Sequence, residues 1–180
     1  MASVTSRRPI EAQPRLWPST RCKAGNGGNM IRVIEGDASQ IASIMPIMES
    51  AFDPAFGEAW TSAQCLSALA LPDCRLLIAQ DDTMICGFAI SRWVLDTEEL
   101  LMIGVAKERQ RQKVGTILLQ QTIKLASEEN RSQLFLECRD GNHAIEFYSN
   151  IGFKPIGRRK NYYKSSDGVR PDAITMAYAL

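Results

Sequence analysis

The chain has 180 residues, 45% hydrophobic and 23% charged, which suffices for one globular domain with its own core and no structural metal. The formal net charge of +1 gives no global field for nucleic acid or an anionic membrane, so it argues against a general DNA-binding protein. The five cysteines form no C-x-x-C pair, and no run of about 18 apolar residues occurs, so a disulfide framework, a zinc site and a membrane helix are not expected. A reducing cytoplasm is the expected location.

Residues 1–29 are expected to be a disordered lead, because they contain three prolines and the run AGNGGN and show little apolar periodicity. The run MIRVIEGD begins abruptly at Met30, so one hypothesis makes Met30 the true start. The alternative is a transit peptide, since no acid precedes Glu11. In either case the folded domain is expected at residues 30–180.

Strands and helices follow one another from residue 31. A first strand at 31–35 precedes a helix capped by Asp37, and Thr61 caps a second helix with Gln64 as its reciprocal partner. Three runs of β-forming residues, 75–80, 84–94 and 99–105, predict a meander with a hairpin turn at 81–83.

After the meander the pattern changes. An amphipathic helix opened by Gly115 extends to about residue 129, and Gly152 ends a short helix at 142–150. Strands are expected at 133–138, 153–157 and 173–178. A meander followed by β-α-β predicts an α/β (α+β) domain, with a mixed, mostly antiparallel central sheet of six to seven strands and helices on both faces.

The stretch at 100–119, LLMIGVAKERQRQKVGTILL, predicts an anion site. It reads as a strand that ends at Val105, a loop rich in Arg, Gln and Lys, and Gly115 at the start of a helix. The first turn of a helix has unpaired N–H groups and the positive end of the helix dipole, so a phosphate binds well there.

Four separated features then carry a resemblance to a known family. They are Q-R-Q-K-V-G after a strand, Leu136-Glu137 on the next strand, A-I-E-F-Y-S-N-I-G-F, and R-K-N-Y-Y followed by D-G and D-A. Together they resemble the GNAT superfamily of acetyl-CoA-dependent N-acetyltransferases, and the last two are similar to its RimI branch of ribosomal-protein alanine N-acetyltransferases. The likeness covers roughly residues 31–178 and implies the GNAT fold, in which two strands separate to form a splayed cofactor cleft.

The resemblance implies acetyl-CoA as co-substrate and no metal. Its pantetheine would bind the backbone of Ile103, Gly104 and Val105, and Asn142 matches a cofactor-contacting asparagine. Its pyrophosphate would lie on the amides of Arg111, Gln112, Lys113, Val114, Gly115 and Thr116. Lys113 stands where the family has a glycine; if this position needs positive φ, lysine costs about 1 kcal/mol there, although its ammonium can itself reach a phosphate.

Acetyl transfer needs a neutral amine, a proton acceptor and a proton donor for the leaving thiolate. An α-amine with a pKa near 8 is about a tenth neutral at pH 7, so a modest general base suffices. Glu137 is the candidate base, with desolvation expected to raise its pKa, and Tyr148 is the candidate acid toward the coenzyme A sulfur, without a covalent enzyme intermediate. Side chains expected to line the acceptor entrance are Trp60, Asn161, Tyr162 and Tyr163, with Asp167 or Asp172 available to hold a cationic amine.

Other readings of these residues stay open. Glu137 is also consistent with a strand-edge ion pair, and Tyr148 with core packing at helical spacing. Glu98 and Glu99 flank the cofactor strand and are an alternative base, although strand-end glutamates are usually solvated.

Two further nucleophilic or basic residues are not expected to react. Cys138 alternates to the face opposite Glu137 and has no His-Asp companions, so it is not expected to be a nucleophile. His143 is expected to be a surface residue in the first turn of its helix.

The expected function is acetylation of a protein N-terminal α-amine, which the resemblance narrows to the alanine of a small-subunit ribosomal protein. The enzyme is expected to be a monomer or weak dimer with no membrane contact and no direct nucleic-acid contact, since the basic cluster at 158–164 is too short for RNA affinity and fits a docking face or a solvated loop better. A small amine or a lysine as acceptor is the first alternative. A non-catalytic acetyl-CoA-binding adaptor, suggested by Lys113, is the second.

Overall fold

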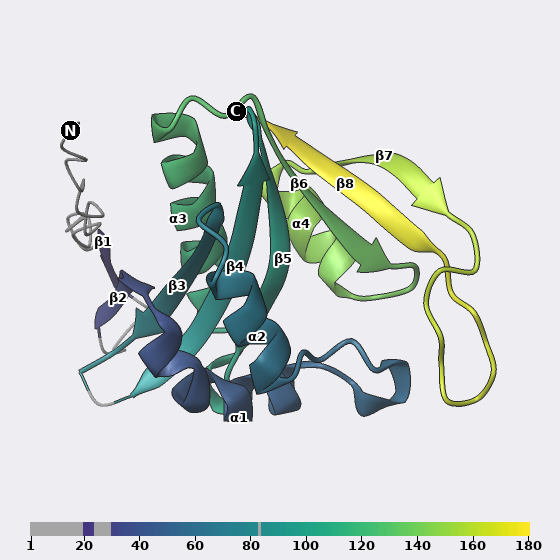
Figure 1. Cartoon of the computed structure of the whole chain (residues 1–180), viewed down its shortest axis with the longest axis horizontal. Helices are drawn as coiled ribbons and strands as arrows, with labels where there is room; N and C mark the ends of the chain where they lie inside the picture. The colour runs from purple at the N-terminus through teal and green to yellow at the C-terminus, as the bar shows by residue number, and fades with distance from the viewer. Residues whose placement is uncertain (1–19, 24–29, 83) are drawn as a thin grey trace, which may run out of the picture.

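The computed structural model describes residues 20–23, 30–82 and 84–180. These residues form one sheet of eight strands in the order β1-β2-β3-β4-β5-β6-β8-β7 (Figure 1). The strands are β1 (Thr20–Lys23), β2 (Met30–Gly36), β3 (Cys74–Gln80), β4 (Ile85–Val94), β5 (Thr97–Val105), β6 (Gln133–Arg139), β7 (Lys154–Arg159) and β8 (Ala173–Ala179). The helices are α1 (Ile41–Ala51), α2 (Ser62–Leu69), α3 (Val114–Glu128) and α4 (Ala144–Ile151), with 3-10 turns η1 (Ala38–Gln40), η2 (Pro54–Phe56) and η3 (Lys107–Arg109).

The elements expected from the sequence pattern are present between residues 30 and 180, with most ends shifted by one or two residues. The capping box of Thr61 and Gln64 is confirmed, and Gly152 ends α4 at a φ of 121°. Asp37 caps the 3-10 turn η1 rather than α1 itself, with Gln40 as its partner. Local side-chain chemistry thus starts and stops these helices as predicted.

The strand count was underestimated. β1 lies inside the segment expected to be disordered and pairs antiparallel with β2, which gives eight strands rather than six or seven. The other residues of that segment, 1–19 and 24–29, and with them the hypotheses on Met30 as start, lie outside the described residues.

Helices cover both faces of the sheet, as expected (Figure 1). One core packs α3 and α4 against the sheet and includes the fully buried Leu118, Leu134 and Phe153. The other packs α1 and α2 against the opposite face around Ile44 and Phe88. Every strand between the helical layers therefore has apolar residues on both faces, which explains continuous runs such as CRLLIAQ in β3.

A bulge in β5 shifts the faces of its side chains. Ile90 pairs with Met102 and Ser91 with Leu100, so Leu101 is an extra residue on β5. Leu100 belongs to the core under α3, whereas Leu101 and Met102 both face the core under α1, and Ile103 returns to the α3 side. The bulge bends β5 at the point where the functional part of the strand begins.

Candidate active site

The strands β5 and β6 separate halfway along their length. Residues 97–100 of β5 pair in parallel with residues 133–136 of β6, and the parallel pairing ends there. Beyond this point β5 continues to Val105 beside β4 alone, and β6 continues to Arg139 beside β8 alone (Figure 1). The backbone of 101–105 therefore has one edge without a strand partner, which is the splay expected for the pantetheine of acetyl-CoA.

Gly104 in this segment is required by Phe88, its pairing partner on β4. A Cβ on Gly104 would lie 2.6 Å from Cε1 of Phe88, a ring that is fully buried. Any larger residue would push β5 away from β4 and change the free edge of the strand.

The start of α3 leaves backbone donors free. The first intrahelical bond runs from Ile117 N–H to the Lys113 carbonyl at 2.9 Å, so the N–H groups of 114–116 have no acceptor within the helix. No side chain caps this end of α3. Together with the positive end of the helix dipole, these donors suit a phosphate.

Two residues of the loop before α3 have left-handed backbones. Lys113 has φ 66° and ψ 8°, and Arg111 has φ 62°. The backbone strain expected at Lys113 is thus present, because a residue with a Cβ is disfavoured at positive φ. The glycine that the family has at this position adopts such angles freely. Both side chains are exposed, and alternation of left-handed residues turns successive N–H groups toward one side, which favours anion binding.

Polar contacts that sequence reasoning missed brace this loop. The Arg109 guanidinium lies 2.6 Å from Oδ2 of Asp81, whose side chain is 0% exposed at the β3–β4 turn. Gln112 Nε2 donates to the Glu108 carbonyl at 2.9 Å. The ion pair ties the loop to the sheet, and the only hint in the sequence was the pair of aspartates in the hairpin turn.

Glu137 lies on β6 just past the point of separation. Its side chain is 18% exposed, and its Oε1 accepts a hydrogen bond from Thr175 Oγ1 at 3.3 Å. Arg159 Nε lies 3.2 Å from the same oxygen. Glu137 therefore forms an ion pair, as the first interpretation of this residue predicts. It also lies where β5 and β6 separate, as its interpretation as a general base predicts.

Tyr148 faces the other side of β6. Its ring packs among Phe147 and Phe153, with centroid distances of 5.2 and 5.9 Å. Burial, and after it the nearby Cys138 and Tyr163, raise the pKa of the Tyr148 phenol. The side chain is thus part of the core and also keeps its proton at neutral pH, as a proton donor must.

Tyr163 is more than an entrance residue. Burial, followed by the charges of Glu58, Cys138 and Glu137, raises the pKa of its phenol. The charge of Glu137 contributes to the raised pKa of Tyr163, and Tyr163 contributes to that of Tyr148, so this half-buried ring interacts electrostatically with both catalytic candidates.

Glu58 and Arg139 form a polar pair that sequence reasoning missed. Arg139 Nε lies 3.4 Å from Oε1 of Glu58, and its guanidinium stacks 3.4 Å above the ring of Phe56. Burial raises the pKa of Glu58, and the charge of Arg139 opposes this. The pair attaches the α1–α2 loop to the end of β6, beside Tyr163.

The remaining acceptor-side candidates are less closely placed. Trp60 lines a shallow cavity of about 400 Å³ on α2 with Ala63, Gln64 and Ser67. Tyr162 is 51% exposed and stacks on Tyr163 at 5.2 Å, edge to face. Asn161 has φ 55° and uses its N–H to donate to Asp172 Oδ1. The structure does not bring Trp60 to the tyrosines by any contact among the described residues.

Both aspartates proposed to hold an amine are engaged within the β7–β8 loop. Asp172 binds Arg158 at 2.8 Å and the N–H of Asn161 at 2.9 Å. Asp167 accepts the N–H of Val169 at 3.0 Å. These carboxylates order the loop, and Ser166 N–H binds the Ala55 carbonyl at 2.9 Å, so the loop also meets η2.

Asn142 lies two residues before the first residue of α4. Its Oδ1 accepts the N–H of Ala144 at 2.9 Å, and its carbonyl accepts the N–H of Ile145 at 3.1 Å. The side-chain amide nitrogen is left for another partner. A cofactor contact of Asn142 can use that nitrogen.

The expectation of solvated strand-end glutamates was wrong for Glu98. It is 0% exposed, accepts a 2.6 Å hydrogen bond from Ser91, and has its pKa raised by burial. It lies opposite Leu134 where β5 and β6 still pair, whereas Glu99 pairs with Arg92 at 2.6 Å. Neither carboxylate lies on the separated part of the strands, because the register places both before Leu100.

Cys138 and His143 behave as expected. Burial, followed by the charge of Glu58, raises the pKa of Cys138 to about 11, so its thiol stays protonated at neutral pH. His143 is exposed at the start of α4. Among the described residues, no group of three or more His, Cys, Asp or Glu side chains suits a metal ion, and none of their helices is long and apolar enough to cross a membrane.

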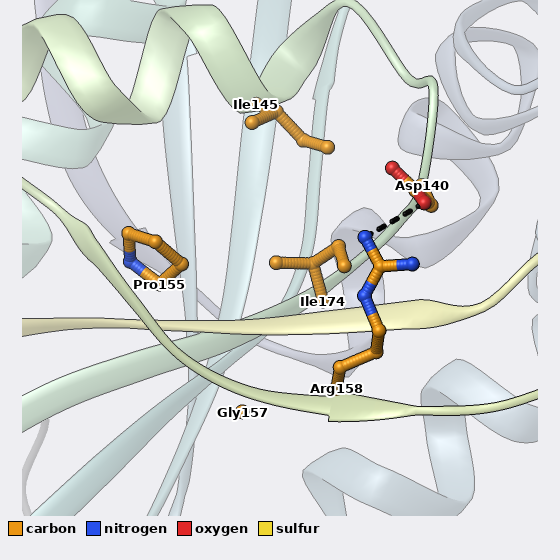
Figure 2. A pocket seen from close by; sticks show the side chains of 6 residues that line it. All are labelled: Asp140, Ile145, Pro155, Gly157, Arg158 and Ile174. Atoms are coloured by element: carbon orange, nitrogen blue, oxygen red, sulfur yellow. Dashed lines mark ion pairs between the residues drawn. The ribbon is translucent and has the colours of Figure 1, made fainter.

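A separate cavity of about 490 Å³ lies between α4 and the strands β7 and β8. In Figure 2 Ile145, Pro155 and Ile174 form its apolar walls, and Arg158 reaches from β7 to Asp140 at 3.0 Å. Glu137, Tyr148 and the loop at 111–116 do not line it. It is not the site assembled above.

Comparisons with known proteins agree with this geometry. The "[Ribosomal protein bS18]-alanine N-acetyltransferase" of Haemophilus influenzae is 37% identical over 100 residues, which are 56% of this chain and 68% of that protein. The protein of the same name from Escherichia coli strain K12 is 40% identical over 95 residues, 52% of this chain and 64% of its own.

A solved structure extends the likeness beyond these aligned segments. The crystal structure of the ribosomal-protein-S18-alanine N-acetyltransferase from Escherichia coli superposes with a TM-score of 0.76 at 30% identity and covers 83% of this chain and 94% of that one. The family model described as Acetyltransferase (GNAT) family matches residues 41–153. The chain therefore belongs to the GNAT acetyltransferase family.

Proposed function

We propose that the chain is an acetyl-CoA-dependent N-acetyltransferase that acts on the α-amine of a protein N-terminus, specifically the N-terminal alanine of a small-subunit ribosomal protein. The observation that carries the proposal is the position of Glu137 and Tyr148 on the two faces of β6, just where β6 leaves β5. The relatives named after the alanine of ribosomal protein bS18 support this acceptor. A cytoplasmic location follows from such an acceptor.

The start of α3 and the free edge of β5 would hold the acetyl donor. Acetyl-CoA supplies the acetyl group as a reactive thioester. The N–H groups of 111–116 suit its pyrophosphate, because those of 114–116 have no acceptor in the helix and two loop residues have left-handed backbones. The N–H and C=O groups of Ile103–Val105 that face away from β4 suit its pantetheine amides, and the amide nitrogen of Asn142 would be a further donor to the cofactor.

Glu137 and Tyr148 would divide the proton transfers. Glu137 accepts the proton of the amine through its second oxygen, Oε2, directly or through a water. Tyr148 donates a hydrogen bond or a proton to the departing sulfur, which its raised pKa allows because the phenol stays neutral across the physiological range. Since the two groups lie on opposite faces of β6, each serves one side of the reacting carbonyl.

The α1–α2 loop and the β7–β8 loop would receive the acceptor peptide. Tyr163 and the exposed Tyr162 come from the β7–β8 loop, and the Glu58–Arg139 pair with Phe56 comes from the α1–α2 loop and the end of β6. Asn161 and Trp60 would contact residues of the peptide after the first. An N-terminal α-amine suits this site because it is partly neutral at pH 7 and needs only a modest base.

The experiment that tests the function is acetyl-CoA turnover on a small peptide panel. One peptide has a free N-terminal alanine, a second is the same peptide with a blocked N-terminus and an internal lysine, and a small amine is the third acceptor. We expect thiol release and a mass gain of one acetyl group with the first peptide only. Preference for lysine or the small amine would refute the proposed N-terminal acceptor. Acetyl-CoA binding without turnover on any amine would refute the proposal that the chain is an enzyme.

Glu137→Gln tests the base within the same assay. We expect about a 100-fold or larger fall in kcat with unchanged acetyl-CoA binding, because a general base commonly contributes 10²–10⁴. Glu49→Gln is the matched control, since Glu49 is an exposed carboxylate on α1. Equal rates for the two variants would remove Glu137 from the mechanism.

A further inference from the structure

Arg159 reaches Glu137 across an intervening strand. Glu137 of β6 pairs with Thr175 of β8, and Thr175 pairs in turn with Gly157 of β7. These three residues form a row on one face of the sheet, and Arg159 lies two residues farther along β7 on that same face. The side chain of Arg159 can therefore extend over β8 to reach Glu137.

The contacts of Glu137 distinguish its two oxygens. Oε1 accepts a hydrogen bond from Thr175 Oγ1 at 3.3 Å, and Arg159 Nε forms an ion pair with the same oxygen at 3.2 Å. Oε2 takes no hydrogen bond and forms no ion pair with any residue within the described part of the chain. The hydrogen bond and the ion pair hold one side of the carboxyl group and leave the other oxygen available.

Arg159 is itself held in place. Its guanidinium lies 5.4 Å from the ring centroid of Tyr162, a cation–π contact. The preceding residue, Arg158, points to the opposite face of β7 and binds Asp140 at 3.0 Å (Figure 2). It also binds Asp172 at 2.8 Å. These contacts anchor the end of β7 and so set the position from which Arg159 extends.

We propose that Arg159 is a positioning residue for the base: it holds Oε1 of Glu137 so that Oε2 faces the amine. The inference rests on the proposed function, because it assigns Glu137 the role of base. Arg159 is 61% exposed, so its contribution is that of a solvent-screened pair. Its charge also favours the ionised carboxylate that a base requires.

Arg159 is the cation that holds the Glu137 carboxylate. Arg159 from β7 forms the ion pair with Glu137, and Thr175 from β8 is a neutral donor. Arg139, two residues along β6, pairs with Glu58 instead. Within the described part of the chain, loss of Arg159 therefore leaves Thr175 alone to hold the Glu137 carboxyl group.

The test compares Arg159→Gln, Arg159→Lys and the control Lys154→Gln, which removes an exposed cation at the other end of β7. We expect Arg159→Gln to lower kcat about two- to fivefold, the range of an exposed ion pair, with the peptide KM unchanged. Arg159→Lys keeps the charge and should restore most of kcat. Lys154→Gln should match the wild type.

Two results would overturn the inference. One is a kcat for Arg159→Gln that equals that of Lys154→Gln; the other is a change in KM alone, which would make Arg159 an acceptor-binding residue. A carbon-13 NMR spectrum of the Glu137 carboxyl at one fixed pH provides a measurement that does not depend on turnover. If its chemical shift changes in Arg159→Gln but not in Lys154→Gln while the wild type acetylates no peptide, the contact is real and the proposed function has failed instead.

Discussion

Lys113 offers a direct test of the loop that begins α3. Its backbone has φ 66° and ψ 8°, a conformation that costs an L-residue about 1–2 kcal/mol. Glycine avoids this cost but loses about 0.5–1 kcal/mol more backbone entropy on folding. Lys113→Gly should therefore be more stable than Lys113→Ala by about 1 kcal/mol, which corresponds to about 2–4 °C in Tm for a domain of this size.

The two variants separate backbone strain from the charge of the side chain. Both remove the ammonium, so they should lose the same amount of acetyl-CoA affinity, whereas only the glycine variant relieves the strain. Urea denaturation measures the free energy of unfolding, and calorimetry with acetyl-CoA measures the affinity. Equal unfolding free energies for Lys113→Gly and Lys113→Ala would refute the strain argument, and wild-type affinity in both would show that the ammonium does not contact the pyrophosphate.

Three further outcomes follow from named contacts. Gly104→Ala should lower the free energy of unfolding by about 1–3 kcal/mol and weaken acetyl-CoA binding, because its Cβ would lie 2.6 Å from the buried Phe88 ring; unchanged urea midpoint and affinity would contradict this. Asp81→Asn should weaken acetyl-CoA binding and lower Tm, since it leaves Arg109 without its buried carboxylate, and wild-type calorimetry would show that the pair does not brace the loop. Because the pKa of the buried Tyr148 phenol is raised above its ordinary value of 10.0, the fold keeps its full stability below pH 10 and loses stability as pH rises above 10. Between about pH 8 and 10.5 the Tyr148→Phe variant should therefore lose less unfolding free energy than the wild type. Parallel loss in the two proteins, measured by urea denaturation, would contradict this expectation.

The paired arginines of β7 illustrate how one strand can serve two faces. Side chains alternate along a strand, so Arg158 points to Asp140 near α4, whereas Arg159 points to Glu137. In the sequence these residues belonged to a basic cluster expected to be a docking face or a solvated loop. The structure gives two of its four cations partners within the domain, which reduces the charge that the cluster offers to an outside partner.

The sequence by itself determined the local elements and the kind of chemistry. Helix starts such as Thr61 with Gln64, the end of α4 at Gly152, and the polar loop before Gly115 depend on residues within a few positions of each other, so periodicity and capping suffice to predict them. The motif around Glu137 and Tyr148 likewise pointed to the family. Tertiary structure alone decided what depends on strand order and register.

Three features were decided by the tertiary structure alone. Glu98 is buried because β5 pairs with β6 at its start, and the extra residue Leu101 reverses the faces of β5. Arg159 reaches Glu137 because β7 and β6 both pair with β8 in a register that puts the two residues on one face. Each depends on residues that lie far apart in the chain or on a one-residue shift in pairing. Long-range pairing and register shifts leave no periodic signal in the sequence, because the side chains of a strand alternate in the same way whichever neighbour it pairs with.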